Sequence, residues 1–591
     1  MTLAVFSAAC TPAPRGRPAR QHARGLDPTP ALLATASQRL LQHAEDICAT
    51  PGTKVPNLPL RICNAVHGRP SLNPLWPQAP LRCQPLVFSP WRATFVCHAR
   101  PPRPPQLPST SDSSSAADLK PQEITSLITA AKSSAEVLQL VCNLCAGFNG
   151  INTVTALHRT AKLLKPADKL SILDHPGYPL LLKLTSAHAP ALAARGAASG
   201  LWALARLPAA PQLQLIHAMT ASLQRTLPAM DSQGLANSIW ALAHIQHTPG
   251  SDVLRNIARR AAVVFADTQD QVSEGDGSSC STVDDLLPHT DMGAVQACKP
   301  QHVSNTLWAF ARLGVDPGQD MMEAAAHQLL RCAKAAKTQE IANSMWAYAK
   351  LGYTPEDECL HALATQFCQQ AHKASPQDLS NLMWAYAELS WAPPCIVTDT
   401  MLTTMQCCMA QAIPQDIANV VWACVKLDVQ PGEAFLRAAT SSMQAVLHAC
   451  TTQSISNLLW SCARLNFSPG PGFARAATDQ ALHLMPGSAG QEITNMLWAL
   501  AMLENSPPPS LKYLQASSRR LKELCPNLGL ADLCQAATAY AHFQYKPTNA
   551  FLDDMAGRFQ ELQPSSKKSV TLMCKAYSKL GLDPRLPWYI S

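Results

Sequence analysis

The sequence predicts an all-α protein, an α-α superhelix (solenoid) of helical-hairpin repeats about 38 residues long. A tryptophan returns at intervals of 38, 68, 38, 38, 38, 38 and 38 residues, each time inside the same helical phrase. The sustained alternation of β-branched residues that would indicate strands is missing. Because a unit of this length cannot bury its apolar face alone, stacked units are expected to share one elongated core. The tryptophans are Trp202, Trp240, Trp308, Trp346, Trp384, Trp422, Trp460 and Trp498.

The repeated phrase predicts the first helix of each unit together with both of its ends. In one unit Ser375 can cap the helix, Pro376 fits its first position, and Asp378 completes a capping box. Gly314 and Gly352 are expected to end their helices, because glycine tolerates the left-handed conformation found there.

A second amphipathic segment separates one such helix from the next, for example residues 359–373 and 434–449. It is rich in Ala, Leu and Gln, and it predicts the second helix of each hairpin. Weaker copies of the phrase, at residues 158–163, 538–541 and 575–581, extend the array at both ends. Terminal repeats are expected to degenerate because one of their faces meets solvent.

The chain is expected to divide into three parts. Residues 1–100 form a basic segment, residues 101–120 a Pro/Ser-rich linker, and residues 121–591 the helical array, with clear repeats at about 185–505. The long interval between Trp240 and Trp308 holds an insertion at about 267–295 that is rich in Asp and Glu, which predicts a solvated loop.

The first 100 residues contain ten arginines and one lysine against three acidic residues, a local net charge of +8, whereas the whole chain carries +7. Such an Arg-, Ala-, Ser- and Pro-rich, acid-poor segment is typical of an organelle transit peptide. A disordered basic arm is the alternative. No run of 18 or more uninterrupted apolar residues occurs, so no membrane span is expected.

The 21 cysteines do not form the spacing of a metal site. The one Cys-x-x-Cys pair, Cys142 and Cys145, falls on a predicted helix with no second pair at ligand distance, so we expect free thiols and no metal. No phosphate-binding glycine loop, His-Glu-x-x-His or nucleophile elbow is present either. The sequence therefore predicts neither an enzyme nor a cofactor.

The phrase around Asn381 and Trp384, Pro-Gln-Asp-Leu-Ser-Asn-Leu-Met-Trp-Ala-Tyr-Ala-x-Leu, at a 38-residue period, resembles the octotricopeptide repeat family of green-algal organellar proteins. The similarity covers about four fifths of the chain. It departs from the family pattern in the Pro-Pro-Pro-Glu-Trp element, of which only fragments such as Pro507 to Pro509 occur, and no RAP domain follows the repeats. The resemblance implies binding of single-stranded organellar RNA to promote stability, processing, splicing or translation of a transcript, in the chloroplast or, alternatively, the mitochondrion.

Comparison between units separates structural residues of the phrase from candidates for RNA contact. A position that distinguishes bases must change its residue type from unit to unit, whereas a position that holds the stacked units together can stay constant. By this criterion the tryptophans and the asparagines three residues before them are interpreted as structural. Those asparagines are Asn237, Asn305, Asn343, Asn381, Asn419, Asn457 and Asn495.

Two other positions are the candidates for RNA contact. Four residues after the tryptophan, basic side chains would line up along the array and could follow a phosphate backbone, or they could complement the helix dipole. These residues, here called the basic row, are Arg206, Arg312, Lys350, Lys426 and Arg464. Six residues before the tryptophan the side chain varies and could contact bases, or it could serve the helix N-terminus. The residues at this position are His302, Glu340, Asp378, Asp416, Ser454 and Glu492.

The function predicted from the sequence is therefore binding of single-stranded organellar RNA in post-transcriptional gene expression. Other proteins of an RNA-processing complex would be further partners. A protein-binding scaffold of the armadillo or HEAT type is the alternative, and the nearly neutral charge of the array favours it.

Overall fold

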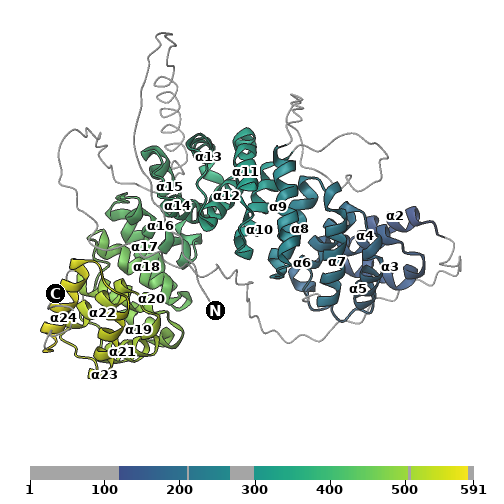
Figure 1. The fold of residues 1–591 in the computed structure, drawn as a ribbon. Helices are drawn as coiled ribbons and strands as arrows, with labels where there is room; N and C mark the ends of the chain where they lie inside the picture. The colour runs from purple at the N-terminus through teal and green to yellow at the C-terminus, as the bar shows by residue number, and fades with distance from the viewer. Residues whose placement is uncertain (1–118, 209–211, 267–297, 504–506, 583–591) are drawn as a thin grey trace, which may run out of the picture. The chain divides into compact units, whose positions relative to one another are not determined.

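The computed structural model describes residues 119–208, 212–266, 298–503 and 507–582. The basic segment, nearly all of the linker and the acidic insertion therefore lie outside the described residues. Within these ranges every regular element is a helix, and each helix packs against its neighbours along the chain (Figure 1). The prediction of an all-α solenoid is confirmed.

The even-numbered helices form the first layer of the array, and each packs against the next even-numbered helix. Those from α6 to α20 each carry one repeated tryptophan, and we call them the Trp helices. The bounds of the first layer are α2 (Pro121–Ala130), α4 (Gly150–Leu163), α6 (Ala194–Arg206), α8 (Ser232–Ile245), α10 (Pro300–Leu313), α12 (Thr338–Leu351), α14 (Pro376–Glu388), α16 (Pro414–Lys426), α18 (Thr452–Arg464), α20 (Gly490–Met502), α22 (Leu530–His542) and α24 (Lys567–Lys579).

The odd-numbered helices form the second layer, and many of them end in a short 3-10 turn such as η7 (Ala371–Lys373). Their bounds are α3 (Ser134–Leu144), α5 (Gly177–His188), α7 (Leu213–Thr226), α9 (Ser251–Ala266), α11 (Gln319–Arg331), α13 (Asp357–Gln369), α15 (Cys395–Cys408), α17 (Glu433–Ala445), α19 (Pro471–Leu484), α21 (Leu511–Leu524) and α23 (Asn549–Glu561).

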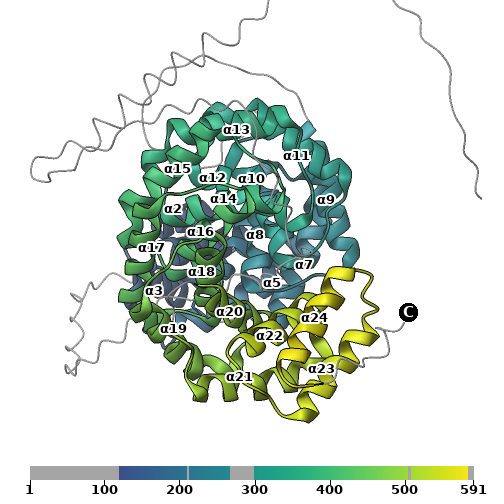
Figure 2. The same ribbon diagram turned by 90° about the vertical axis from the view of Figure 1, so that its left-hand side faces the viewer.

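The two layers pack with different closeness. Consecutive first-layer helices contact each other extensively along the array, whereas from α11 to α23 consecutive second-layer helices touch much less. Closer packing in one layer bends the stack toward that layer, and Figure 2 shows α10 to α20 on the inner side of α9 to α21. The helices α8 and α10 pack directly on each other although the long insertion separates them in sequence, so the inserted residues do not interrupt the first layer.

The predicted helix ends are present in the structure. The backbone N–H of Asp378 donates to the Ser375 hydroxyl over 3.2 Å, and the N–H of Ser375 donates to the Asp378 carboxylate over 3.0 Å. Gly352 ends its helix with φ of 70°. In the next units the corresponding left-handed residues are Ser390 and Asp428, with φ of 54° and 55°, so two helices end this way without glycine.

One contact recurs within the hairpins and was not predicted. A long polar side chain of the second helix donates to the backbone carbonyl just before the N-cap of the first helix, which fixes the two helices of one unit to each other. The pairs, with their donor–acceptor distances, are Arg225 to Leu192 at 2.6 Å, Arg260 to Met230 at 2.8 Å, Gln328 to Cys298 at 2.8 Å, Gln370 to Ala336 at 2.7 Å, Arg520 to Ser488 at 3.3 Å and Arg558 to Leu528 at 3.3 Å.

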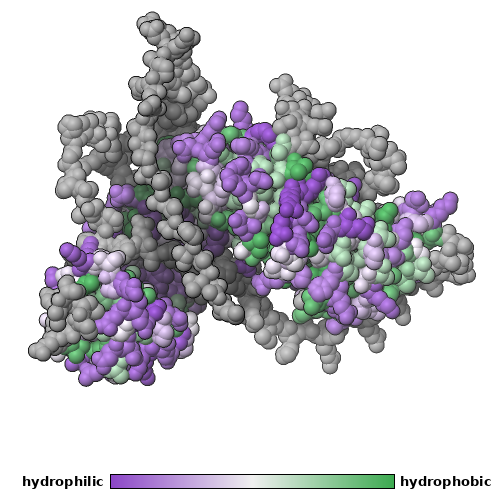
Figure 3. Space-filling view, in the orientation of Figure 1, coloured by the Kyte–Doolittle hydropathy of each residue, from purple (hydrophilic) through white to green (hydrophobic). Residues whose placement is uncertain are grey.

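The core lies between the two layers. The position two residues after the tryptophan points into it, and Phe310, Tyr348 and Tyr386 are completely buried there. Cys424 and Cys462 occupy the same position and are equally buried. Hydrophilic residues cover much of the surface visible in Figure 3, with apolar residues in small groups among them.

Candidate nucleic-acid interface

Each Trp helix is buried on nearly all sides and meets solvent along one narrow line. In α12 this line contains Gln339, Asn343, Trp346 and Lys350, at successive spacings of four, three and four residues. Such spacings bring side chains to the same face of a helix with 3.6 residues per turn. Gln339 is exposed, Asn343 and Lys350 are half-buried, and Trp346 is 7% exposed, whereas Ile341, the apolar residue between them, is completely buried.

The tryptophans lie at the edge of the core along this line. Trp346, Trp384, Trp422 and Trp498 are between 2% and 8% exposed. The other four, Trp202, Trp240, Trp308 and Trp460, are only partly buried and pack against the core cluster. The solvent-facing line therefore includes an aromatic side chain in every Trp helix.

The asparagines are half-buried or buried along the same line. One of them contacts the neighbouring unit, because the amide of Asn419 donates to the hydroxyl of Ser380 in α14 over 3.4 Å. Other side chains connect the N-terminal ends of neighbouring first-layer helices. These contacts join Ser232 to His302 at 2.8 Å, Thr338 to Asp378 at 3.4 Å and Thr494 to Asp532 at 3.2 Å.

The variable position six residues before the tryptophan serves the helix N-terminus. Each of these side chains accepts a hydrogen bond from the backbone N–H of the N-cap residue. The distances are 3.4 Å for His302, 2.9 Å for Glu340, 3.0 Å for Asp378, 3.3 Å for Asp416, 3.1 Å for Ser454 and 3.0 Å for Glu492. Since His302, Asp378, Asp416 and Ser454 are also buried, the geometry favours the capping interpretation over base contact.

The residues four after the tryptophan lie side by side on consecutive first-layer helices. Burial lowers the pKa of His244, and the positive charges of Arg206 and Arg312 on the two flanking helices lower it further. Burial raises the pKa of Glu388, while Lys426 and Lys350 on its two flanks lower it. The basic row therefore runs from helix to helix, with Glu388 as an acidic member within it.

Cations of this row lie over the tryptophan rings. The distance from the charged group to the ring centroid is 5.0 Å for Arg206 on Trp202, 5.3 Å for Lys426 on Trp422 and 5.8 Å for Arg464 on Trp460. Lys350 lies 6.0 Å from the ring of Trp384, which belongs to the next unit. At these four places a cation and an aromatic ring lie together on the Trp helices.

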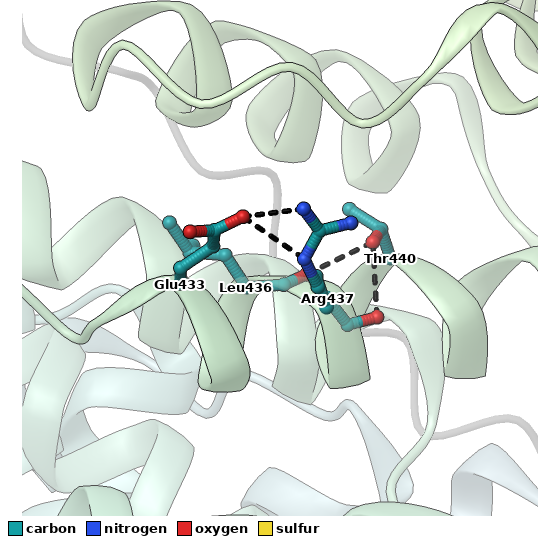
Figure 4. Close-up of polar contacts among 4 residues, drawn as sticks. All are labelled: Glu433, Leu436, Arg437 and Thr440. Carbon is teal, nitrogen blue, oxygen red and sulfur yellow. Dashed lines mark hydrogen bonds and ion pairs between the residues drawn. The ribbon is translucent and has the colours of Figure 1, made fainter.

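In the second layer, several arginines form ion pairs with acidic residues of their own helix. In α17 the guanidinium of Arg437 pairs with Glu433 one turn earlier, and the Thr440 hydroxyl donates to the carbonyl oxygens of Leu436 and Arg437 (Figure 4). Three further ion pairs join positions three apart on second-layer helices, Arg255 with Asp252, Arg520 with Glu523 and Arg558 with Glu561.

Sequence reasoning missed the glutamines at the start of the solvent-facing line. They stand seven residues before the tryptophan and are exposed or half-buried in every unit that has them. They are Gln233, Gln301, Gln339, Gln377, Gln415, Gln453 and Gln491. The spacing carries the signal, because residues seven apart share one helix face, but a position that is constant between units does not distinguish bases by the criterion of variation.

The structure offers no site for a metal within the described residues. No group of three or more His, Cys, Asp or Glu side chains lies close enough to hold an ion there, and Cys142 and Cys145 are free thiols. None of the described helices has the length and apolar character that a membrane crossing requires.

No protein-family model and no curated protein matches the chain. Among solved structures, an engineered protein is similar at 12% identity over 75% of this chain and 98% of its own, with a TM-score of 0.20. A homology model of the full-length AP-3 complex has 10% identity over 80% of this chain and 84% of its own, at 0.20. The crystal structure of a pentatricopeptide repeat protein from maize has 10% identity over 80% of this chain and 84% of its own, with a TM-score of 0.16. TM-scores this low say nothing about function.

Proposed function

We propose that the protein binds single-stranded RNA along the solvent-facing line of its Trp helices and acts in organellar gene expression. The observation that carries the proposal is the repetition, in the seven Trp helices from α8 to α20, of an amide pair and a tryptophan. In five of the eight Trp helices a cation of the basic row follows the tryptophan. Glutamine and asparagine amides can donate to and accept from base edges. Basic side chains neutralise phosphates, and indole rings and guanidinium planes stack on unpaired bases.

The organellar part of the proposal is supported by the composition of residues 1–100 and by the resemblance to octotricopeptide repeats. We propose the chloroplast as the compartment and the mitochondrion as the alternative. One nucleotide per repeat, as in other α-solenoid RNA-binding proteins, gives a footprint of roughly 8 to 11 nucleotides.

The test replaces four members of the basic row, Arg312, Lys350, Lys426 and Arg464, with glutamine. Binding to every single-stranded RNA should weaken, and the slope of log K against log salt should flatten by about 0.7 per lost contact. A matched control changes four exposed second-layer residues in the same way, Arg255, Arg259, Arg437 and Arg475. Because both variants lose the same charge, a difference between them reports the location of the RNA.

The measurement is equilibrium binding of a 12-nucleotide RNA at several salt concentrations, with circular dichroism to confirm folding. If the two folded variants bind alike, the inner face is not the RNA surface. If the wild-type protein binds no RNA and an organelle extract yields partners that resist ribonuclease, a protein scaffold replaces the proposal.

A further inference from the structure

The first Trp helix departs from the others at two positions of the solvent-facing line, with Arg195 in place of the glutamine and Ser199 in place of the asparagine. Ser199 stands three residues before Trp202, where each of the following Trp helices has asparagine. A hollow of about 240 Å³ opens beside it on the face formed by α4, α6, α8 and α10. A water molecule occupies about 30 Å³ in the liquid, so the hollow has room for a heterocycle. An asparagine at 199 would place a larger polar group in this space.

The hollow is lined mainly by neutral polar side chains. Around Ser199 and Trp202 are four amides from the next two helices, which are Gln233, Asn237, Gln301 and Asn305. Neither a carboxylate nor a lysine or arginine is among the lining residues. The amides offer both donors and acceptors, and the indole of Trp202 offers an aromatic surface.

Two histidines complete the lining, and both are uncharged at neutral pH. Burial, followed by the charges of neighbouring basic residues, lowers the pKa of His158 to about 4, and its ring lies 4.8 Å from that of Trp202. Burial likewise lowers the pKa of His302 to about 4, with a further contribution from Lys299. The backbone N–H of Lys299 donates to Nδ1 of His302, so the proton of that ring is on Nε2 and is available to an acceptor.

We propose that this hollow, the Ser199 pocket, binds one unstacked adenine base, and that the base belongs to the RNA strand bound along the inner face. The proposal rests on the proposed function and adds a base-specific anchor to it. An uncharged lining suits the edge of a heterocycle better than a phosphate. Asparagine and glutamine pair with the N6 and N7 atoms of adenine, whereas guanine is usually bound by arginine or lysine and cytosine by carboxylates.

The position of the pocket within the array fits an anchor for a strand. Arg206 lies 5.0 Å from the ring of Trp202, so a cation of the basic row stands next to the pocket and can hold the phosphate beside the bound base. Single-stranded RNA presents its Watson–Crick and Hoogsteen edges once its bases are unstacked, and aromatic side chains can stack on them.

The test substitutes Ser199→Asn, which gives this unit the residue of the others and narrows the pocket. The probes are 12-nucleotide oligo(A), oligo(C) and oligo(U), free adenosine 5′-monophosphate, and an oligo(U) carrying one 8-azidoadenosine for photo-crosslinking. Ser441→Asn, at an exposed position of α17, is the matched control. Gln233→Ala removes one amide of the lining without enlarging a side chain, and it keeps the test valid if Ser199→Asn does not fold.

We expect the wild-type protein to bind oligo(A) about ten-fold more tightly than oligo(C) or oligo(U), the discrimination of one good bidentate pair. Ser199→Asn should abolish this preference, so that the variant binds the three oligonucleotides with equal affinity. The crosslink should map to residues 199–202 or 233–237. Displacement of the crosslink by equimolar free nucleotide would assign the adenine site to a nucleotide instead of a strand.

Two results would overturn the pocket while leaving RNA binding intact. One is equal affinity of the wild-type protein for the three oligonucleotides, and the other is an adenine preference that survives in folded Ser199→Asn and Gln233→Ala. By contrast, binding of free adenosine 5′-monophosphate without binding of any oligonucleotide would refute the proposed function and retain the pocket as an adenine site.

Discussion

The buried carboxylate of Asp416 allows a test of how burial and hydrogen bonding together set the stability of a Trp helix. Its carboxylate is 7% exposed and lies at the N-terminus of α16. Burial raises the pKa of Asp416 to about 6, and the nearby Asp378 raises it as well. The backbone N–H of Ile413 and the hydroxyl of Ser380 oppose this shift by hydrogen bonding to the carboxylate. Desolvation therefore outweighs the capping contacts that favour the charged form.

The sign of the pH dependence follows from proton binding. Between about pH 4 and pH 6 the folded state retains a proton on Asp416 that the unfolded state has released, so stability falls as the pH rises through this window. Above about pH 6 Asp416 is ionised in both states, and the free energy of unfolding falls no further. A shift of about two pKa units corresponds to about 3 kcal/mol.

The variant Asp416→Asn keeps an oxygen that can accept from Ile413 and never acquires a charge. It should therefore raise the free energy of local unfolding by up to about 3 kcal/mol at pH 7.5 and by only about 1 kcal/mol at pH 4.5. Hydrogen exchange across α14 to α18 at the two pH values measures this, because a repeat array opens locally before it unfolds globally.

The exposed Asp479 of α19 supplies the control, Asp479→Asn. If Asp416→Asn destabilises the neighbouring helices at pH 7.5, the cap and the helix dipole dominate over burial. An effect of equal size at both pH values would equally refute the reasoning, since it would show that the charge of Asp416 is irrelevant.

Three further predictions concern the fold and the N-terminal segment. Trp384→Ala removes a side chain that is 6% exposed and should cost on the order of 3 to 5 kcal/mol; unchanged hydrogen-exchange protection over residues 346–422 would contradict this. Ser390→Gly relieves a left-handed serine with φ of 54° and should stabilise the end of α14 by about 1 kcal/mol in chemical denaturation, whereas Ser390→Val should destabilise it. A fusion of residues 1–100 to a fluorescent reporter should enter an organelle, because the segment is basic and acid-poor; diffuse cytosolic fluorescence would instead support a basic arm.

Much of the fold followed from the sequence alone. The constant repeat length makes residues equivalent from unit to unit. The helix with Ser375 as its N-cap and Asp378 in its capping box therefore predicted the equivalent helices of the other units. The same equivalence placed the basic row at one position of the Trp helices, with His244 of α8 and Glu388 of α14 between its members. The interval of 68 residues did not disturb it because α8 and α10 pack directly.

The tertiary structure alone decided which residues of the phrase meet solvent. A helical wheel divides one isolated helix into an apolar and a polar half, but a first-layer helix is covered by two first-layer neighbours and by the second layer as well. In α12 the line from Gln339 through Asn343 and Trp346 to Lys350 reaches solvent, so residues interpreted as structural and a member of the basic row share one surface.

The remaining surprises depend on contacts between residues that are distant in sequence. The Arg260 contact to the carbonyl of Met230 and the hollow beside Ser199 arise from the distance between packed helices, which a period does not specify. The sequence determined which positions repeat, because equivalent residues must satisfy the same local helix and the same neighbours. The packing determined what those positions face, because burial is a property of the stacked array and not of any single unit.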